Sequence, residues 1–453
     1  MADIIAAIST ALAPAGIGVI RLSGDGCART ADGVLKTVSG KPLAEAPNRK
    51  LVLANLLDRS GRVIDRILAV YTRGPHSYTG EDTVELQCHG SPAVLTEALS
   101  HLFLHGARQA GPGEFTKRAF LNGQMDLTSA EAVIDLIEAE TADAAANAAG
   151  QVAGALRRKL EPVYESLVSV MSHFHAVLDY PDEDIDDFQL AQYSGLLEEQ
   201  KQTLDALLAT CRRGNIVKNG VGAVILGRPN AGKSSLLNAL AGYDRVIVTD
   251  IPGTTRDTVE EKIRLGRLLL RLTDTAGIRE AADTVERLGV TRAVEAAGSA
   301  DLALMVIDGS EPLSEEDFRA MEAARAAKHT VCILSKADLP QKVTPEQLDF
   351  DTVIALSSVT GQGIPELTAA VEDLFGGETP CDGTLLTNVR HETAITAARD
   401  AITRTQEAMG LGETPDAVLV EVEAALEAIG EVIGKSMRED ITNGIFSRFC
   451  VGK

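Results

Sequence analysis

Tryptophan is absent from this sequence, aromatic residues make up only 4% of it, and its six cysteines never form a C-x-x-C pair. Scattered cysteines exclude a disulfide framework and a thiolate zinc site, which favours a reducing compartment. The sequence also lacks an uncharged apolar run of the roughly 18 to 20 residues that cross a bilayer. Asp3 stands where a secretory leader would be basic, and no Lys or Arg precedes Arg21, which argues against a signal peptide. We therefore expect a cytoplasmic protein with no membrane segment.

Basic residues are scarce relative to acidic ones, with 43 Lys and Arg against 65 Asp and Glu, a formal net charge of −22. Such a surface repels polyanions, so any contact with RNA is expected to be local or made through a partner. We interpret the short basic clusters at residues 157–159 and 212–213 as solvated helix faces or helix C-termini. A chain of 453 residues is expected to form two to four domains.

Residues 1–118 alternate short apolar runs with Gly and Pro, a pattern typical of a mixed α/β domain. The predicted strands are Ile17–Leu22, Leu51–Leu57, Ile67–Tyr71 and Thr83–Gln87.

A helical pattern begins at Thr128, which has the spacing of a capping box with Glu131. Ala-rich periodicity predicts one long helix from there toward Leu178, and a second, antiparallel helix over residues 190–210. Gly214 is expected to end that second helix.

Strands then alternate with helices, which predicts a doubly wound parallel sheet. Its predicted strands are Val221–Leu226, Leu268–Leu272, Leu302–Ile307, Thr330–Leu334 and Thr352–Leu356. Helical periodicity returns over residues 393–409 and 415–433. The expected domains are therefore residues 1–118, a first helical part over 119–215, an inserted α/β domain over 216–377 and a second helical part over 378–453.

The segment Gly227–Ser234 reads GRPNAGKS, follows a buried strand and opens a helix. This is the context of a phosphate-binding loop, whose backbone N–H groups surround the phosphates. Lys233 supplies a charge to the β and γ oxygens, and the Ser234 hydroxyl is offered to magnesium.

Two further segments extend this phosphate site. Residues 274–277 read DTAG after the next strong strand, where Asp274 can reach magnesium through water and the Gly277 amide can sense a γ-phosphate. Between them, residues 253–257 form a polar loop whose Thr255 is expected to close over the metal.

The base-reading loop is expected at Ser335-Lys-Ala-Asp338, after a strand. Asp338 would accept from guanine N1 and N2, Lys336 would lay its stem along the base, and residues 357–358 would meet guanine O6. Because Ser335 is shorter than the customary Asn, we expect a bracing hydrogen bond to be lost or water-mediated, and base discrimination to be weaker.

Water activation needs another group, because Ile278 stands where Ras-like enzymes carry a Gln. The candidates are the charged residues just downstream, which are Arg279, Glu280, Asp283 and Glu286. Arg279 has two interpretations, a surface charge or a catalytic cation. Asn230 is either a turn-forming residue or a ligand for a monovalent cation that replaces an arginine finger.

Four further motifs, together with the nucleotide loops, resemble the MnmE (TrmE) family of tRNA-modification GTPases over essentially the whole chain. They are GVIRLSG at 18–24, SYTGED at 77–82, PGEFTKRAF at 112–120 and IFSRFCVGK at 445–453.

The resemblance implies an N-terminal dimerising domain that binds a 5-formyltetrahydrofolate-type donor, a discontinuous helical domain and a G domain that dimerises with potassium and GTP. It also implies an FAD-dependent partner, MnmG, a homodimer that forms a heterotetramer or larger complex with it, and action at C5 of the wobble uridine of certain tRNAs.

Site residues follow from the same resemblance. Folate contacts map to Arg21, Glu85, Gln124 and Lys453, although Gln124 stands where the family often has Lys. Without the resemblance, Arg21, Glu85 and Lys453 would be a strand-edge charge, a structural carboxylate and a frayed terminus.

The metal and catalytic assignments are likewise implied by the resemblance. Potassium maps to Asn230, Thr249, Ile251 and Thr254, magnesium to Ser234 and Thr255, and catalytic roles to Glu286, which positions water, and to Cys450. Arg279 stays a catalytic candidate from its position alone. Without the resemblance, Cys450 would be a small buried hydrophobe. The full set of expected GTP contacts is Asn230, Ala231, Gly232, Lys233, Ser234, Ser235, Thr249, Asp250, Ile251, Pro252, Gly253, Thr254, Thr255, Asp274, Thr275, Ala276, Gly277, Lys336, Asp338, Ser357 and Ser358.

Two other classes of function stay open. One is a ribosome-assembly or signalling GTPase that works as a switch without modification chemistry. The other is a P-loop ATPase or small-molecule kinase, which Asp338 with Lys336 disfavours.

Overall fold

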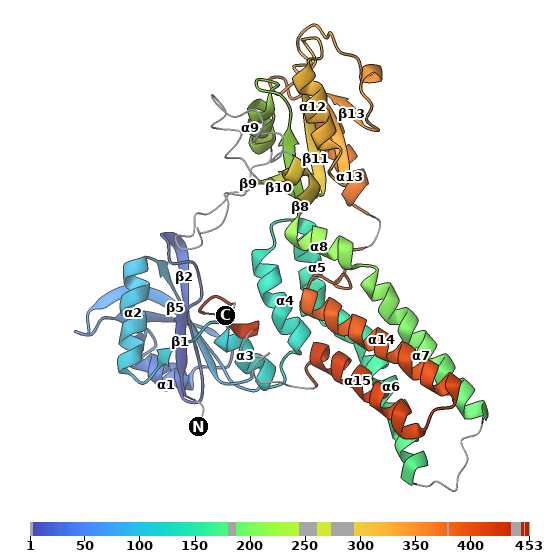
Figure 1. Cartoon of the computed structure of the whole chain (residues 1–453). Coiled ribbons are helices and arrows are strands. Elements are labelled where there is room, and N and C mark those ends of the chain that lie inside the picture. The colour runs from blue at the N-terminus through green and yellow to red at the C-terminus, as the bar shows by residue number, and fades with distance from the viewer. Residues whose placement is uncertain are drawn as a thin grey trace. The chain divides into compact units, whose positions relative to one another are not determined.

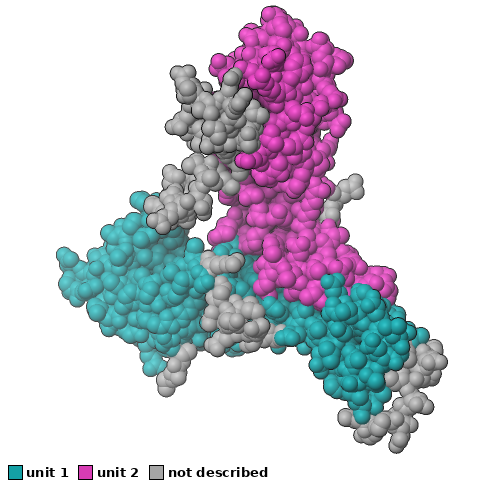
Figure 2. All heavy atoms as spheres, in the orientation of Figure 1, with its two compact units in different colours: residues 1–134, 151–197, 400–453 teal, residues 135–150, 198–399 magenta. Residues whose placement is uncertain are grey.

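The computed structural model describes residues 3–179, 187–243, 261–272, 294–377, 380–435, 445–447 and 449–452. The chain divides into two compact units, which Figure 2 colours separately. The first comprises residues 1–134, 151–197 and 400–453, and the second comprises residues 135–150 and 198–399. Each unit is therefore built from segments that are far apart in the sequence.

A seven-stranded sheet organises the N-terminal part of the first unit, in the order β3-β4-β5-β6-β2-β1-β7. Alternate residues of its strands point into a core that also holds apolar side chains of helices α1 and α2. The four predicted strands are confirmed as β2, β4, β5 and β6. The elements are β1 (Ile5–Ile8), β2 (Ala15–Ser23), α1 (Cys27–Asp32), β3 (Leu35–Thr37), β4 (Leu51–Leu57), β5 (Val63–Thr72), β6 (Thr83–Gly90), α2 (Pro92–Leu104) and β7 (Arg108–Gln109) (Figure 1).

The predicted long helix is wrong, because three helices occupy its span: α4 (Leu127–Glu138), α5 (Ala142–Val152) and α6 (Ala155–Asp179). The Thr141 hydroxyl accepts from the Ala144 N–H at 3.1 Å and starts α5. Gly154 has φ 79°, a left-handed conformation that breaks the chain before α6. Ala-rich periodicity continues across both breaks and therefore conceals them.

The predicted cap at Thr128 is also displaced. Asp126 precedes the helix, and its carboxylate accepts from the Ser129 N–H at 2.8 Å and from the Thr128 hydroxyl at 2.5 Å. A carboxylate at this position satisfies a free N–H group and also complements the helix dipole.

The remaining helices largely follow the sequence pattern and are α7 (Asp187–Leu208), α8 (Cys211–Asn219), α14 (Val389–Leu411) and α15 (Pro415–Ile433). The prediction that Gly214 ends a helix is wrong. Gly214 lies inside α8, where an added Cβ would collide with the Leu386 carbonyl oxygen. The helix ends instead at Gly220, with φ 79°. Close packing, rather than a stop signal, explains this glycine.

The C-terminal tail packs against the N-terminal sheet domain. Val451 pairs with Pro112 in an isolated antiparallel bridge. The Ser9 hydroxyl donates to the Gly452 carbonyl oxygen at 2.9 Å, and the Gly113 N–H donates to the Cys450 carbonyl oxygen at 3.3 Å. The two ends of the sequence therefore meet within the first unit.

A six-stranded sheet forms most of the second unit, in the order β13-β12-β11-β8-β10-β9. All its pairings are parallel except β9 with β10. Helices α9 and α13 contribute to the core on one face and α12 to the core on the other, which confirms the doubly wound fold. The elements are β8 (Val221–Leu226), α9 (Lys233–Tyr243), β9 (Glu261–Leu265), β10 (Leu268–Leu272), β11 (Leu302–Asp308), α12 (Glu315–Ala324), β12 (His329–Ser335), β13 (Val353–Ala355) and α13 (Ile364–Phe375) (Figure 1).

Polar contacts hold α5 to this sheet and to the segment that leaves it. Arg267, in the turn between β9 and β10, donates to the Asp143 carboxylate at 2.9 Å. The buried Asn147 side chain accepts from the Gly383 N–H at 3.1 Å and donates to the Leu385 carbonyl oxygen at 3.4 Å. These contacts explain why residues 135–150 belong to the same compact unit as the α/β domain.

Among the described residues, no helix combines the length and the apolar character that a membrane crossing requires.

Candidate nucleotide and ligand sites

The phosphate loop joins β8 to α9 through three unusual backbone conformations. Gly227 has φ 148°, Asn230 has φ 62° and Gly232 has φ 103°. A Cβ on Gly227 would collide with the Val306 carbonyl oxygen, so this position needs a glycine. The resulting turn places backbone N–H groups at the start of α9, where they can bind phosphate.

Lys233 is the first residue of α9 and folds back over the loop. Its ammonium donates to the carbonyl oxygens of Gly227 and Arg228, both at 2.8 Å. Burial lowers the pKa of Lys233 from its ordinary value. Asn230, Ser234 and Ser235 lie exposed along the loop and the first turn of α9.

Ser335 ends β12 and braces the phosphate loop directly. Its hydroxyl donates to the Ala231 carbonyl oxygen at 2.5 Å, and the side chain is buried. The expected loss of this brace is therefore wrong, because the ends of β12 and β8 lie close enough for the shorter side chain to reach. The two loops that would hold opposite ends of a nucleotide are thus hydrogen-bonded to each other.

Asp338 is held in position by a neighbouring loop. The buried Ser357 hydroxyl donates to Asp338 Oδ1 at 2.7 Å, while Ser358 is half-buried beside it. Lys336 has φ 56°, a left-handed conformation, and its ammonium donates to Asp308 Oδ2 at 2.5 Å. The base-reading side chains come from the carboxyl ends of β12 and β13, as the sequence predicts.

Several predicted nucleotide, metal and folate residues lie outside the described residues. They are Thr249, Asp250, Ile251, Pro252, Gly253, Thr254, Thr255, Asp274, Thr275, Ala276, Gly277, Arg279, Glu286 and Lys453. Within the part of the chain that the structure describes, no group of three or more His, Cys, Asp or Glu side chains could hold a metal ion. Among the described residues, the candidate ligands for a metal ion are instead the hydroxyl and amide oxygens of the phosphate loop.

A second candidate site lies on the face of the N-terminal sheet opposite α1 and α2. Arg21 on β2 is paired with Glu85 on β6, with Arg21 Nη2 2.8 Å from Glu85 Oε1. The Arg21 guanidinium lies 5.2 Å from the ring centroid of Tyr78 and 5.8 Å from that of Phe115. The structure thus brings together two of the predicted folate residues with two aromatic rings.

Gln124 and the tail approach the same domain. A Cβ on Gly80 would meet the Gln124 side chain at 3.2 Å, so Gln124 lies beside the loop over residues 77–82 that carries Tyr78. Cys450 is exposed, which excludes the alternative of a small buried hydrophobe.

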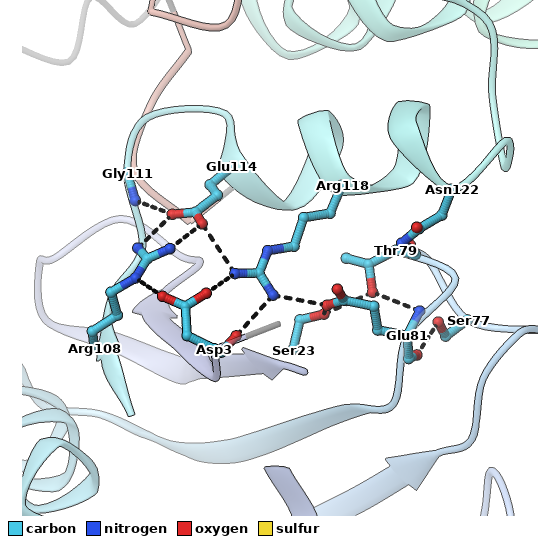
Figure 3. A network of polar contacts seen from close by, with 10 residues as sticks. All are labelled: Asp3, Ser23, Ser77, Thr79, Glu81, Arg108, Gly111, Glu114, Arg118 and Asn122. Atoms are coloured by element: carbon cyan, nitrogen blue, oxygen red, sulfur yellow. Dashed lines mark hydrogen bonds and ion pairs between the residues drawn. The ribbon is translucent and has the colours of Figure 1, made fainter. Parts of the chain in front are cut away.

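An ion-pair network that motif reasoning missed supports this loop (Figure 3). Arg118 of α3 (Glu114–Leu121) contacts Glu81, Glu114 and Asp3 at 2.9, 3.1 and 2.8 Å. Glu81 in turn accepts from the Ser23 hydroxyl at 2.7 Å. The network is drawn with Asp3, Ser23, Ser77, Thr79, Glu81, Arg108, Gly111, Glu114, Arg118 and Asn122. The motif at residues 112–120 contains part of it, but only the fold shows which strands it joins.

Glu114 should make this region sensitive to acid. Burial alone would raise the pKa of its carboxyl, but hydrogen bonds from Arg108, the Gly111 N–H and Arg118 lower that pKa to about 2. The stabilisation of the folded state by ionised Glu114 is therefore complete above the ordinary pKa near 4.5, and it is lost as pH falls toward 2. We expect hydrogen-exchange protection of residues 111–121, corrected for intrinsic exchange, to fall about tenfold over that range.

Glu114→Gln should lower this protection at neutral pH and flatten its acid dependence. The matched control is Glu97→Gln on α2, which removes only an exposed pair with Arg59 at 3.5 Å. A variant at Glu114 with the wild-type acid profile would contradict the assignment.

The strand order, the phosphate loop and the base-reading loop together define a GTP-binding protein with a Ras-like α/β domain. The family described as "GTP-binding protein TrmE N-terminus" matches residues 4–124, and the "MnmE helical domain" family matches residues 127–450. The chain belongs to the MnmE (TrmE) family of tRNA modification GTPases.

Full-length relatives agree with this assignment. The tRNA modification GTPase MnmE of Roseiflexus sp. (strain RS-1) is 43% identical over 468 residues, covering 100% of this chain and 99% of that protein. The protein of the same name from Clostridioides difficile (strain 630) is 38% identical, covering 100% of this chain and 99% of its own. Among solved structures, the G domain of the T. maritima FeoB iron transporter is 26% identical with a TM-score of 0.26, covering 34% of this chain and 97% of that one.

Proposed function

We propose that this protein is a potassium-dependent cytoplasmic GTPase that works with the FAD-dependent protein MnmG on certain tRNAs. The pair would add an aminomethyl or carboxymethylaminomethyl group to C5 of the wobble uridine. The observation that carries the proposal is the full-length similarity to proteins named tRNA modification GTPases. GTP hydrolysis would drive G-domain dimerisation and conformational cycling rather than the bond-forming chemistry itself.

The phosphate loop supports the GTPase half of the proposal. The Lys233 ammonium donates to two carbonyl oxygens of the loop. With nucleotide bound, it would donate to the β and γ phosphate oxygens instead. The exposed Ser234 hydroxyl, with Thr255, would hold magnesium, which neutralises charge on the phosphates. Asp274 would reach that magnesium through water, and the Gly277 amide would contact the γ-phosphate. Glu286, with Arg279 as a further candidate, would orient water.

Asn230 supports the potassium requirement. Its left-handed backbone, with φ 62°, keeps the exposed carboxamide on the loop, where its oxygen could bind a monovalent cation. Thr249, Ile251 and Thr254 would supply the other oxygens. A cation there would offset phosphate charge in the transition state without an arginine finger.

GTP turnover in matched potassium and sodium chloride buffers tests this proposal. We expect potassium to raise the rate on the order of tenfold or more. Asn230→Gly should abolish the difference while keeping the left-handed backbone, because glycine adopts that conformation without strain. Equal wild-type rates in both salts would contradict the potassium site and return the missing charge to Arg279 or a partner protein.

The Arg21–Glu85 pair supports a site for 5-formyltetrahydrofolate or a related tetrahydrofolate. Glu85 would accept from the pterin amino group, and Arg21 with Lys453 would hold the glutamate carboxylates. Arg21 Nε and Nη2 both contact Glu85 Oε1, and we propose that the second carboxylate oxygen of Glu85 meets the ligand. The tail places Cys450 in the same domain, where we propose that it takes part in the modification.

An exposed apolar patch supports a homodimer through the N-terminal domain. Leu51, Leu53 and Leu68 are 51%, 38% and 39% exposed. Strand register places them on the sheet face that carries Arg21 and Glu85. A second copy would cover this patch beside the folate site, and MnmG would bind the dimer as a heterotetramer or larger complex.

A further inference from the structure

We propose that Asp308 is a positioning residue for GTP binding: it fixes the Lys336 side chain against the base and ties the base-reading loop to the phosphate loop. This inference goes beyond the contacts assigned above and rests on the assignment of the nucleotide site to these loops. Asp308 is the last residue of β11, between the strands that carry the two loops.

The Asp308 carboxylate is buried, with the residue 3% exposed. Its Oδ1 accepts from the N–H and the hydroxyl of Ser310, at 3.0 and 2.6 Å. Its Oδ2 accepts from the Lys336 ammonium at 2.5 Å. A buried carboxylate with this set of donors has one orientation, so it can hold the lysine in one place.

Lys336 needs such an anchor. Its backbone has φ 56°, which an L-residue adopts only when its surroundings require it. Four rotatable bonds would otherwise let the side chain swing through solvent. With the ammonium fixed on Asp308, the aliphatic stem is pre-ordered for the face of a purine, and binding does not have to order it.

Arg228, the second residue of the phosphate loop, also approaches the Asp308 carboxylate. Its Nη2 lies 3.9 Å from Asp308 Oδ2 and 2.5 Å from Glu311 Oε2. Its Nε forms an ion pair at 3.3 Å with the buried Asp317, without the geometry of a hydrogen bond. The buried Asp308 carboxylate thus accepts from Lys336 of the base-reading loop and lies 3.9 Å from Arg228 of the phosphate loop.

The test is a double-mutant cycle on the full chain, with binding of fluorescent N-methylanthraniloyl-GDP as the readout. GDP avoids turnover and the γ-phosphate contacts. We expect Asp308→Asn and Lys336→Met each to raise Kd about tenfold, because each removes a charge-assisted contact. The double variant should also lose only about tenfold, because both changes break the same contact.

Inosine diphosphate separates this role from base reading by Asp338. Inosine diphosphate lacks the 2-amino group that Asp338 would bind, whereas the Lys336 stem contacts the face of either base. Asp308→Asn should therefore raise the Kd of inosine diphosphate by the same factor as that of GDP. Ser310→Ala gives a milder disturbance of the Asp308 carboxylate, and its effect should disappear in a Lys336→Met background. The matched control is Glu311→Gln, because the Glu311 side chain is 56% exposed and pairs with Arg228 rather than with Lys336.

A loss of about a hundredfold in the double variant would overturn the proposal, since the two residues would then act independently. Unchanged GDP binding by Asp308→Asn would overturn it as well, even with a lowered melting temperature. Failure of the wild-type protein to bind GDP would instead contradict the nucleotide site itself.

Discussion

Replacing Asp338 by Asn should lower GTP affinity on the order of a thousandfold and create a preference for xanthosine triphosphate. The Ser357 hydroxyl donates to Asp338 Oδ1 at 2.7 Å, and an Asn side chain would keep its oxygen there. Its amide N–H groups would then face guanine N1–H and the 2-amino group, donor against donor. A site with mismatched buried polar groups rejects its ligand strongly.

Xanthine carries a carbonyl oxygen at C2, which accepts from an amide N–H, so its triphosphate should bind the variant. Competition between GTP and xanthosine triphosphate measures the change. The control is Asp349→Asn, an exposed carboxylate that pairs with Arg325 at 2.9 Å in the same domain. Equal GTP affinity of the Asp338 variant and the wild type would show that this loop does not read the base.

Replacing Lys233 by Met should abolish GTP hydrolysis, with a loss of kcat/KM on the order of a thousandfold or more. The ammonium lies at the start of α9, where its two present acceptors are loop carbonyl oxygens at 2.8 Å. Phosphate oxygens carry far more charge than these carbonyls, so a bound nucleotide would take over the ammonium. Methionine keeps much of the side-chain volume and removes the charge together with the N–H donors.

Lys328→Met is the matched control, because it removes an equal charge from an exposed pair with Asp301 at 2.8 Å in the same domain. It should hydrolyse GTP at the wild-type rate. A Lys233 variant that retained more than a tenth of wild-type kcat/KM would contradict the phosphate site.

The sequence predicted the strands with a strong apolar signal and the glycine loop, because these signals are local, but it did not predict β1, β3, β7 and β9. Continuous apolar residues specify β8 and β11, and the steric demand at Gly227 follows from the loop pattern itself. The breaks in the Ala-rich helical region depend on single residues such as Thr141 and Gly154. The helical periodicity continues on both sides of them, so the sequence pattern does not reveal the breaks.

Contacts between distant loops could not be predicted from the sequence. Whether Ser335 reaches the phosphate loop depends on the separation of β12 and β8, which only the folded sheet fixes. Asp308 is an ordinary strand-end carboxylate in the sequence, and its meeting with Lys336, 28 residues further on, depends on the parallel pairing of β11 with β12. The Arg108–Glu114–Arg118 network likewise joins a strand and a helix whose distance no motif records.

Reconstitution of the modification reaction would show whether this GTPase acts on tRNA. The full chain would be combined with MnmG, FAD, a tetrahydrofolate donor, an amino-group donor, unmodified tRNA and GTP in potassium chloride, and the nucleosides analysed by mass spectrometry. We predict a C5-substituted wobble uridine with the wild type and with Lys328→Met, and none with Lys233→Met. Rapid GTP hydrolysis without any substituted uridine would contradict the claim and favour a GTPase switch without modification chemistry.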